Sequence, residues 1–222
     1  MHIDKIRDKI PEKLYEAVAA AGVTELRPAQ VKSIHAGLLE GKNLLVCTPT
    51  ASGKTLIAEL ASISAILNKK GKAVYVVPLK ALATEKYNDF KKRYGSFIRV
   101  AISIGDFDSS DAYLADYDLL IVTSEKLDSL IRHHAPWVKM ISVVVIDEIH
   151  LLNDPGRGPT LEILITMLRQ LLPKSQLIAL SATIGNPEEL ARWLDAELVT
   201  DNWRPVRLHQ GVYRDGVIRF KK

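Results

Sequence analysis

The feature that most constrains the fold is a repeated alternation of short apolar runs with longer stretches of helical pattern. The apolar runs are nearly continuous in Val, Ile and Leu, as in strands that are covered on both faces. Six such runs occur, at residues 43–47, 73–77, 99–104, 119–122, 143–146 and 177–180. Helical patterns occupy residues 54–67, 79–93, 125–133 and 160–172. This order predicts an α/β fold built from βαβ units, with a mostly parallel central sheet and helices on both faces.

Domain organisation follows from where this pattern stops. Residues 1–204 show no internal repeat and no linker-like composition before residue 200, so we expect one main domain there. Residues 206–213 and 217–220 then flank Asp215-Gly216, a pair that suits a tight turn. We therefore expect a hairpin within residues 205–222.

Composition excludes some classes of protein and leaves others open. The 30 basic and 26 acidic residues give a net charge of +4, which is compatible with a phosphate-rich partner but does not require one. Cys47 is the only cysteine and cannot form an internal disulfide, and the pair His133-His134 lacks metal-ligand partners, so we expect no zinc site. The charged N-terminus and the lack of an apolar stretch of about 20 residues predict a cytoplasmic protein without a membrane partner.

The first motif that carries chemistry follows the first apolar run and opens a helical pattern, which is the context of a phosphate-binding loop. It consists of Thr48, Pro49, Thr50, Ala51, Ser52, Gly53, Lys54 and Thr55. In such a loop backbone amides converge on phosphate oxygens, Lys54 would meet the β- and γ-phosphates and Thr55 would bind Mg²⁺. Thr48 stands where the general pattern has Gly, and the alternative is a chance Gly-Lys-Thr at a helix start.

The second motif, Asp147-Glu148-Ile149-His150, follows the fifth apolar run. It places two carboxylates at the C-terminal end of a buried strand, where α/β sheets form their ligand sites. Asp147 is suited to holding the magnesium ion, and Glu148 to orienting or deprotonating the attacking water. Acidic residues are also common at helix N-termini for electrostatic reasons, so the motif gains its weight from the loop at 48–55.

Together the motifs resemble those of superfamily 2 DExH-box helicases, and in particular the archaeal Hjm-type branched-DNA repair helicases related to the Ski helicases. The resemblance covers nearly the whole chain. It rests on residues 26–30, which end in Gln30, and on residues 48–55, 78–83, 123–126, 147–150, 181–183, 184–190 and 203–206. It implies a RecA-like three-layer domain over residues 1–204, with the glutamine motif in an N-terminal segment over residues 1–30. The hairpin would then lead toward a second RecA-like domain that is missing from this chain.

The resemblance also implies roles for individual residues. Gln30 would recognise adenine, and its amide offers the donor and acceptor that the N6 and N7 edge requires. Catalysis would depend on Lys54, Asp147, Glu148 and His150, with ATP and Mg²⁺ as cofactors and Thr55 and Asp147 as the metal ligands. Ser181, Ala182 and Thr183 would couple the γ-phosphate site to movement through His150. Lys80, Thr123, Ser124 and Lys126 would contact the nucleic-acid backbone, although exposed lysines are more often merely solvated.

Three classes of function stay open at this point. The first is the motor domain of a DNA helicase that acts on single-stranded or branched DNA, with a Ski-related RNA helicase as its less favoured variant, and we expect a monomer. The second is an ATP-gated module that clamps nucleic acid without turnover, although a clamp needs neither Glu148 nor the triplet at 181–183. The third is another phosphate-loop enzyme such as a GTPase, which would be expected to carry an Asn-Lys-x-Asp sequence that is absent here.

Overall fold

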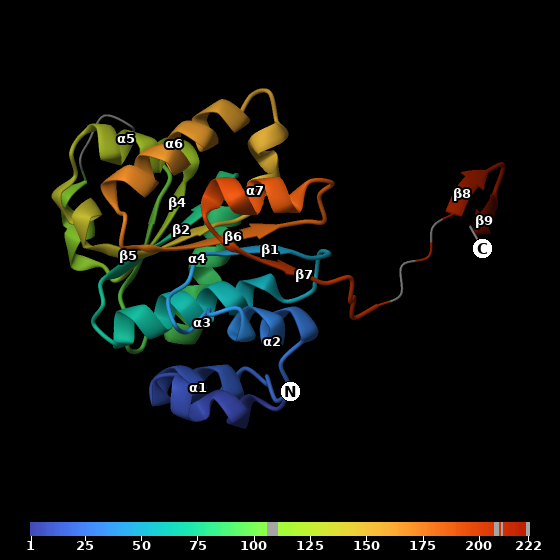
Figure 1. The fold of residues 1–222 in the computed structure, drawn as a ribbon, viewed down its shortest axis with the longest axis horizontal. Coiled ribbons are helices and arrows are strands. Elements are labelled where there is room, and N and C mark those ends of the chain that lie inside the picture. Colours follow the sequence, from blue (N-terminus) through green and yellow to red (C-terminus); the bar gives the residue numbers. More distant parts are fainter. Residues whose placement is uncertain (106–110, 207–208, 210, 221–222) are drawn as a thin grey trace.

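The computed structural model describes residues 1–222 except 106–110, 207, 208, 210, 221 and 222 (Figure 1). The helices are η1 (Ile3–Lys9), α1 (Glu12–Ala20), α2 (Pro28–His35), α3 (Lys54–Leu67), α4 (Lys80–Tyr94), η2 (Ala112–Asp116), α5 (Ser124–Arg132), η3 (Pro136–Met140), η4 (Ile149–Asn153), α6 (Gly158–Leu171) and α7 (Pro187–Leu194). The strands are β1 (Leu44–Cys47), β2 (Lys72–Val77), β3 (Val100–Ser103), β4 (Leu119–Thr123), β5 (Ile141–Ile146), β6 (Gln176–Ser181), β7 (Glu197–Thr200), β8 (Gly211–Arg214) and β9 (Val217–Phe220).

Seven strands form one sheet in the order β3-β4-β2-β5-β6-β1-β7, and every neighbouring pair is parallel. The predicted α/β fold with a parallel central sheet is confirmed, and each of the six apolar runs supplies a strand. The seventh strand, β7, was not expected from the sequence. It pairs with β1 at the sheet edge, where only Val199 of its four residues is buried.

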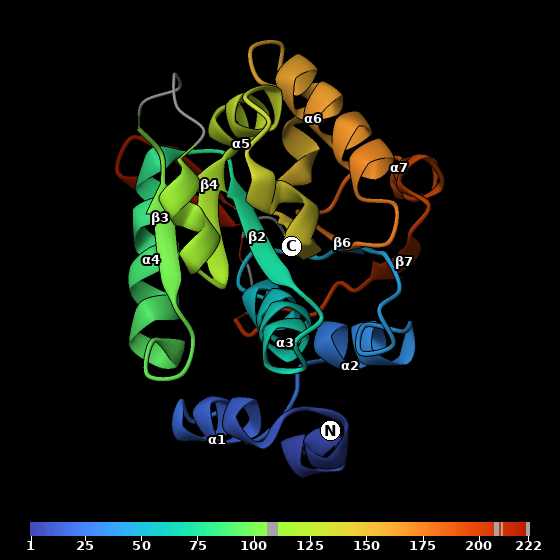
Figure 2. The same ribbon diagram turned by 90° about the vertical axis from the view of Figure 1, so that its left-hand side faces the viewer.

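Two helical layers enclose this sheet, and each strand contributes alternate side chains to both (Figures 1 and 2). In β1, for example, Leu44 and Val46 join the core beneath α1, α2, α3 and α4, whereas Leu45 and Cys47 join the core beneath α5, α6 and α7. Period-two alternation with both faces apolar explains why the strands read as continuous hydrophobic runs. The three-layer arrangement that the sequence predicts is therefore present.

The parallel direction of the strands brings the predicted motifs to one edge of the sheet. The loop at 48–55 follows β1, the acidic motif follows β5, and residues 181–183 begin at the last residue of β6. Pairing continues just beyond the strands, because the Thr48 amide donates to the Ser181 carbonyl at 3.2 Å and the Asp147 amide donates to the Val76 carbonyl at 2.9 Å. These bonds fix the spacing of the loops that follow.

The C-terminal hairpin pairs β8 with β9 in antiparallel register, and it lies apart from the sheet (Figure 1). Asp215 and Gly216 both have positive φ, 49° and 81°, as a type I′ turn requires. All residues of the two strands are exposed. Part of the strand expected from residue 206 lies outside the described residues, and whether the hairpin leads toward another domain stays a prediction.

Among the described residues, no helix combines the length and the apolar character that crossing a bilayer requires.

Candidate functional site

The loop at 48–55 is a compact turn held by its own polar groups. Thr48 and Ser52 are buried and share a hydrogen bond of 2.7 Å between their hydroxyls. Ala51 and Gly53 have positive φ, 65° and 90°, so the chain reverses before α3 begins at Lys54. The N-terminus of α3 therefore directly follows this turn, and a helix N-terminus is a site that favours binding of phosphate. Thr48 at the position of the usual glycine is compatible with this turn.

Gln30 and Arg27 connect this loop to the N-terminus of helix α2 through hydrogen bonds. Gln30 is 3% exposed and uses both ends of its amide, because its Nε2 donates to the Gly53 carbonyl at 2.9 Å and its Oε1 accepts from the Arg27 amide at 2.8 Å. Arg27 donates through Nη1 to the Ala51 carbonyl, and its guanidinium lies 5.5 Å from the Trp203 ring centroid. Gln30 keeps one N–H and one lone pair beyond these bonds. Recognition of adenine through them stays a prediction.

Lys54 and the two carboxylates of the acidic motif lie in one electrostatic cluster. The Lys54 ammonium donates to the carbonyls of Thr48 and Pro49 at 2.9 and 3.2 Å, so it is half-buried over the loop rather than exposed as a simple loop lysine would be. Burial lowers the pKa of Lys54, and the carboxylates of Glu148 and Asp147 oppose that shift. Lys54 and Asp147 are 93 residues apart in sequence, yet both lie at the carboxyl ends of strands in the same sheet.

A second cluster connects Asp147 to Thr55. Tyr75, in the middle of β2 and fully buried, donates its hydroxyl to Asp147 Oδ2 at 2.9 Å. Burial raises the pKa of Tyr75 well above its usual range, and Asp147 raises it further, so the phenol remains a donor. Lys86 on α4 lies 5.8 Å from the Tyr75 ring centroid and donates to Thr55 Oγ1 at 3.0 Å.

Glu148 and His150 lie beside this cluster at the start of η4. Glu148 has a left-handed backbone, with φ 53°, a conformation that costs energy for a residue with a side chain and is common at functional sites. Its carboxylate is 3.3 Å from His150 Nδ1. Ser181 Oγ is buried beside the Cys47 thiol, while Ala182 is half-buried and Thr183 is exposed. The coupling role of residues 181–183 stays a prediction.

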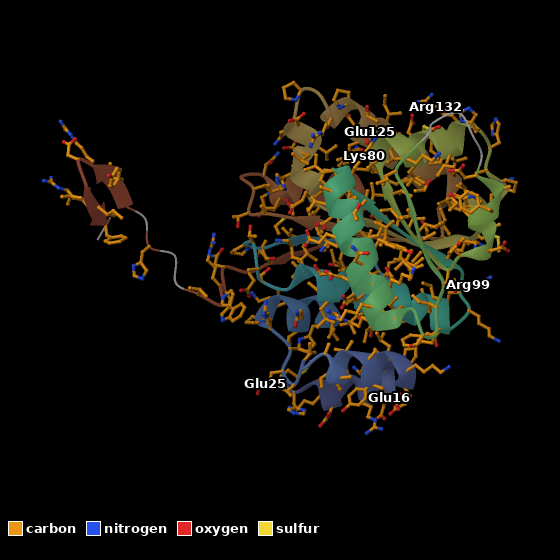
Figure 3. The ribbon with its side chains drawn as sticks, turned by 180° about the vertical axis from the view of Figure 1, so that it is seen from behind. Glu16, Glu25, Lys80, Arg99, Glu125 and Arg132 are labelled. Atoms are coloured by element: carbon orange, nitrogen blue, oxygen red, sulfur yellow. The ribbon has the colours of Figure 1, made fainter. Side chains whose placement is uncertain are left out.

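The residues expected to contact nucleic acid separate into two groups. Lys80 is exposed at the first position of α4 (Figure 3). Lys126 is 1% exposed, and its ammonium forms an ion pair of 2.8 Å with Asp111. Contact between Lys126 and a phosphate stays a prediction, and it would require this buried ammonium to leave Asp111.

Thr123 and Ser124 are also largely buried, at 3% and 5% exposure. Thr123 caps α5 by accepting the Lys126 amide at 3.3 Å, the local role that the hydroxyl of a helix N-cap commonly fills. Any phosphate contact by these two residues would have to use small exposed areas. Lys80 is thus the member of the predicted set that solvent reaches freely.

Sequence reasoning missed three residues of the site, namely Arg27, Tyr75 and Lys86. Arg27 directly precedes the proline that starts α2, a position that carries no signal of its own. Tyr75 was recognised only as part of an apolar run, although a hydroxyl at the centre of a buried strand requires a partner. Lys86 looked like any lysine on a helix surface, and its contact with Thr55 spans 31 residues.

The oxygen atoms of the cluster fit a magnesium ion. Mg²⁺ prefers hard oxygen ligands, of which carboxylates are the most common in proteins. The Thr55 hydroxyl and the Asp147 carboxylate are such ligands, and the bonds to Lys86 and Tyr75 place them around one group of side chains. We name them as the residues that would hold the metal.

Known proteins resemble this chain in sequence. Residues 27–190 match the family model described as DEAD/DEAH box helicase. A protein named ATP-dependent DNA helicase Hel308 from Pyrococcus horikoshii is 49% identical over 98% of this chain, and that of Methanocaldococcus jannaschii is 53% identical over 94%. The chain spans only 30% and 18% of the length of these two relatives.

Solved structures resemble the chain as well. The crystal structure of the DUF1998 helicase MrfA bound to DNA and AMPPNP superposes with a TM-score of 0.76 and 29% sequence identity, covering 88% of this chain and 30% of the other. The matched family segment contains the loop at 48–55 and the acidic motif at 147–150, which the structure brings together. On the sequence match and the fold together, this chain belongs to the DEAD/DEAH box helicase family.

Proposed function

We propose that this chain is the ATP-binding motor domain of an ATP-dependent DNA helicase. The observation that carries the proposal is that Lys54 and Thr55 follow β1 and that Asp147 and Glu148 follow β5 of one parallel sheet. Contacts of Lys86 and Tyr75 then link Thr55 to Asp147. These segments supply different parts of one phosphoryl-transfer site, since one would hold the phosphates and the other the metal and the water. Relatives named DNA helicases support DNA as the substrate.

The proposed mechanism assigns each residue a task. The loop amides and Lys54 bind and orient the triphosphate, and Glu148 orients the attacking water and accepts its proton. Magnesium, held by Thr55 and Asp147, would neutralise charge on the β- and γ-phosphates. Lys54 already sits over the loop, where phosphate oxygens would replace the Thr48 and Pro49 carbonyls as acceptors.

Gln30 would select adenine, while His150 and residues 181–183 would transmit the state of the γ-phosphate. Lys80, at the carboxyl edge of the sheet, would contact the backbone of single-stranded or branched DNA. Its position at the start of α4 supports this role, because a lysine there opposes the helix dipole and gains nothing for the stability of the helix.

The whole motor would need more than this domain. This chain spans less than a third of relatives such as the Pyrococcus horikoshii protein, so we propose that a second RecA-like domain in the longer protein closes over the nucleotide. An arginine contributed by such a domain is worth about 10³ to 10⁵ in turnover in related phosphoryl-transfer enzymes. The domain alone is then expected to bind ATP and to hydrolyse it slowly.

The test compares ATPase rates with and without single-stranded DNA, for this chain and for a version extended through the second domain. DNA-stimulated turnover in the extended protein only, lost in its Glu148→Gln variant while nucleotide binding persists, supports the proposal. Equal turnover in both proteins, independent of DNA, would overturn it.

The nucleic-acid surface has its own test. Lys80→Ala should weaken binding of the extended protein to single-stranded DNA. It should also reduce the slope of log binding constant against log salt concentration by about one, as expected for one lost phosphate contact. Lys126→Ala should instead lower thermal stability, because it removes the buried ion pair with Asp111. An unchanged salt slope in the Lys80 variant would remove that residue from the DNA interface.

A further inference from the structure

Lys86 makes a contact that the proposed mechanism does not use. It lies in the middle of α4, and its ammonium donates to the hydroxyl of Thr55, the second residue of α3. The donor and acceptor are 3.0 Å apart and partly buried. Both residues line a hollow of about 590 Å³ that also includes Gln30 and Gly53. The ammonium therefore sits at the nucleotide loop and is not simply solvated.

The surroundings place this positive charge between Thr55, which would hold the metal, and Tyr75, which bonds to the other residue that would hold it, Asp147. On one side is Thr55 Oγ1, and on the other is the ring of Tyr75, whose hydroxyl bonds to Asp147 Oδ2 at 2.9 Å. Lys54 lies close enough that Lys86 contributes to lowering its pKa. Lys86 also favours the charged form of Glu59 on α3, whose pKa is raised by burial. The charge of Lys86 therefore influences the pKa of both Lys54 and Glu59.

The Lys86 ammonium and a divalent cation would compete for the Thr55 hydroxyl oxygen. Mg²⁺ demands near-ideal octahedral geometry at about 2.0–2.1 Å from each ligand. An ammonium that is hydrogen-bonded to the same hydroxyl would then lie next to a doubly charged ion. Like charges at such separation repel strongly in a partly buried site. Binding of the metal should require the lysine to withdraw.

We infer that Lys86 is a positioning residue that holds the Thr55 hydroxyl in the metal-free site and competes with the divalent cation for that oxygen. The inference rests on the proposed function, in which Thr55 is a metal ligand. It gives α4 a direct connection to the state of the nucleotide site. The same helix carries Lys80 at its exposed end, so release of Lys86 alters the restraint on the helix that would contact DNA.

The experiment measures metal-dependent nucleotide binding with this chain. A fluorescent, non-hydrolysable ATP analogue is held at fixed concentration while Mg²⁺ is titrated, and the half-saturating metal concentration is recorded. Lys86→Met keeps the length and the apolar stem but removes the charge and the donor. It should lower the half-saturating Mg²⁺ concentration about fivefold or more, the change expected for loss of one competing hydrogen bond. Lys86→Arg, which retains charge and donors, should stay near the parent value.

The matched control is Lys91→Met on the same helix. The Lys91 ammonium is exposed and, among the described residues, donates locally to the Tyr87 hydroxyl at 2.8 Å, so this variant changes net charge equally without touching Thr55. Its half-saturating Mg²⁺ concentration should match that of the parent. If Lys91→Met shifts the value as much as Lys86→Met, the effect is one of general charge and the inference is overturned.

Three other outcomes separate this inference from the proposed function. If Lys86→Met weakens binding of the analogue in EDTA and leaves the metal requirement unchanged, Lys86 binds phosphate and does not compete with the metal. If the parent binds the analogue with no dependence on Mg²⁺ or on Thr55, the proposed site itself is wrong. Metal-dependent binding in the parent with an unshifted Lys86→Met variant overturns the inference alone.

Discussion

Replacing Gly53 by Ala tests how tightly the nucleotide loop is specified. Gly53 has φ 90°, and a Cβ there would lie 2.5 Å from Gln30 Nε2. A left-handed conformation costs a residue with a side chain about 1–2 kcal/mol. Moving the buried Gln30 amide breaks its bond to the Gly53 carbonyl, which is worth about 1 kcal/mol more. The combined penalty is about 2–3 kcal/mol.

This penalty must appear either in folding or in nucleotide binding. If the loop keeps its conformation, Gly53→Ala lowers the free energy of unfolding by that amount. If the loop relaxes, the nucleotide must restore it, and affinity falls by about 30- to 150-fold. Urea unfolding and titration of a fluorescent ATP analogue are measured on the same variant. The loss of stability and the loss of binding free energy should add up to the penalty of about 2–3 kcal/mol.

The control for this prediction is Gly22→Ala. Gly22 also has a left-handed backbone, with φ 82°, but a Cβ there meets nothing within 4 Å. That variant should lose about 1–2 kcal/mol of stability and no nucleotide affinity. The reasoning is refuted if Gly53→Ala equals the parent in both measurements, or if it merely reproduces the losses of Gly22→Ala.

Other predictions concern charges inside the domain. Arg93→Met leaves the buried Glu59 carboxylate without the guanidinium 2.6 Å away, which should cost about 3–5 kcal/mol and lower the Tm, and Glu59→Gln in the same chain should recover part of the loss. Burial raises the pKa of Glu59, so its charged form destabilises the fold as pH rises through that pKa. The deficit of the Arg93 variant relative to the parent should therefore shrink as pH falls, and a deficit that grows on acidification would contradict this account. Burial also raises the pKa of Cys47 to about 11, so iodoacetamide at pH 8 should label it only as urea unfolds the chain, and rapid labelling of the native protein would show the thiol to be accessible.

The sequence was sufficient for the parallel sheet because strands buried on both faces leave a strong local signal. β7 left none, since in this edge strand of four residues only Val199 is buried. The strand forms because β1 offers it a free edge, with Leu44 opposite Glu197, a condition that only the folded sheet creates. Tertiary pairing therefore decides what local propensity cannot.

The same difference between local signals and tertiary contacts applies to the candidate site. The segments at 48–55 and 147–150 are each contiguous, so their residue types alone indicate phosphate and metal chemistry. Contacts between distant segments could not be predicted, and Tyr75 meets Asp147 across 72 residues. The burial of Lys126 against Asp111 could not be predicted either, because it depends on how the fold brings these two residues together.

The central claim is that Lys54 and Thr55 meet Asp147 around one metal-bound triphosphate. The most direct measurement is a crystal structure with a non-hydrolysable ATP analogue and Mn²⁺ in place of Mg²⁺, in which the anomalous signal locates the metal. We expect a manganese peak bonded to Thr55 Oγ1, beside Asp147, with the β- and γ-phosphates against Lys54. A nucleotide bound elsewhere, or a metal distant from Thr55 and Asp147, would contradict the account.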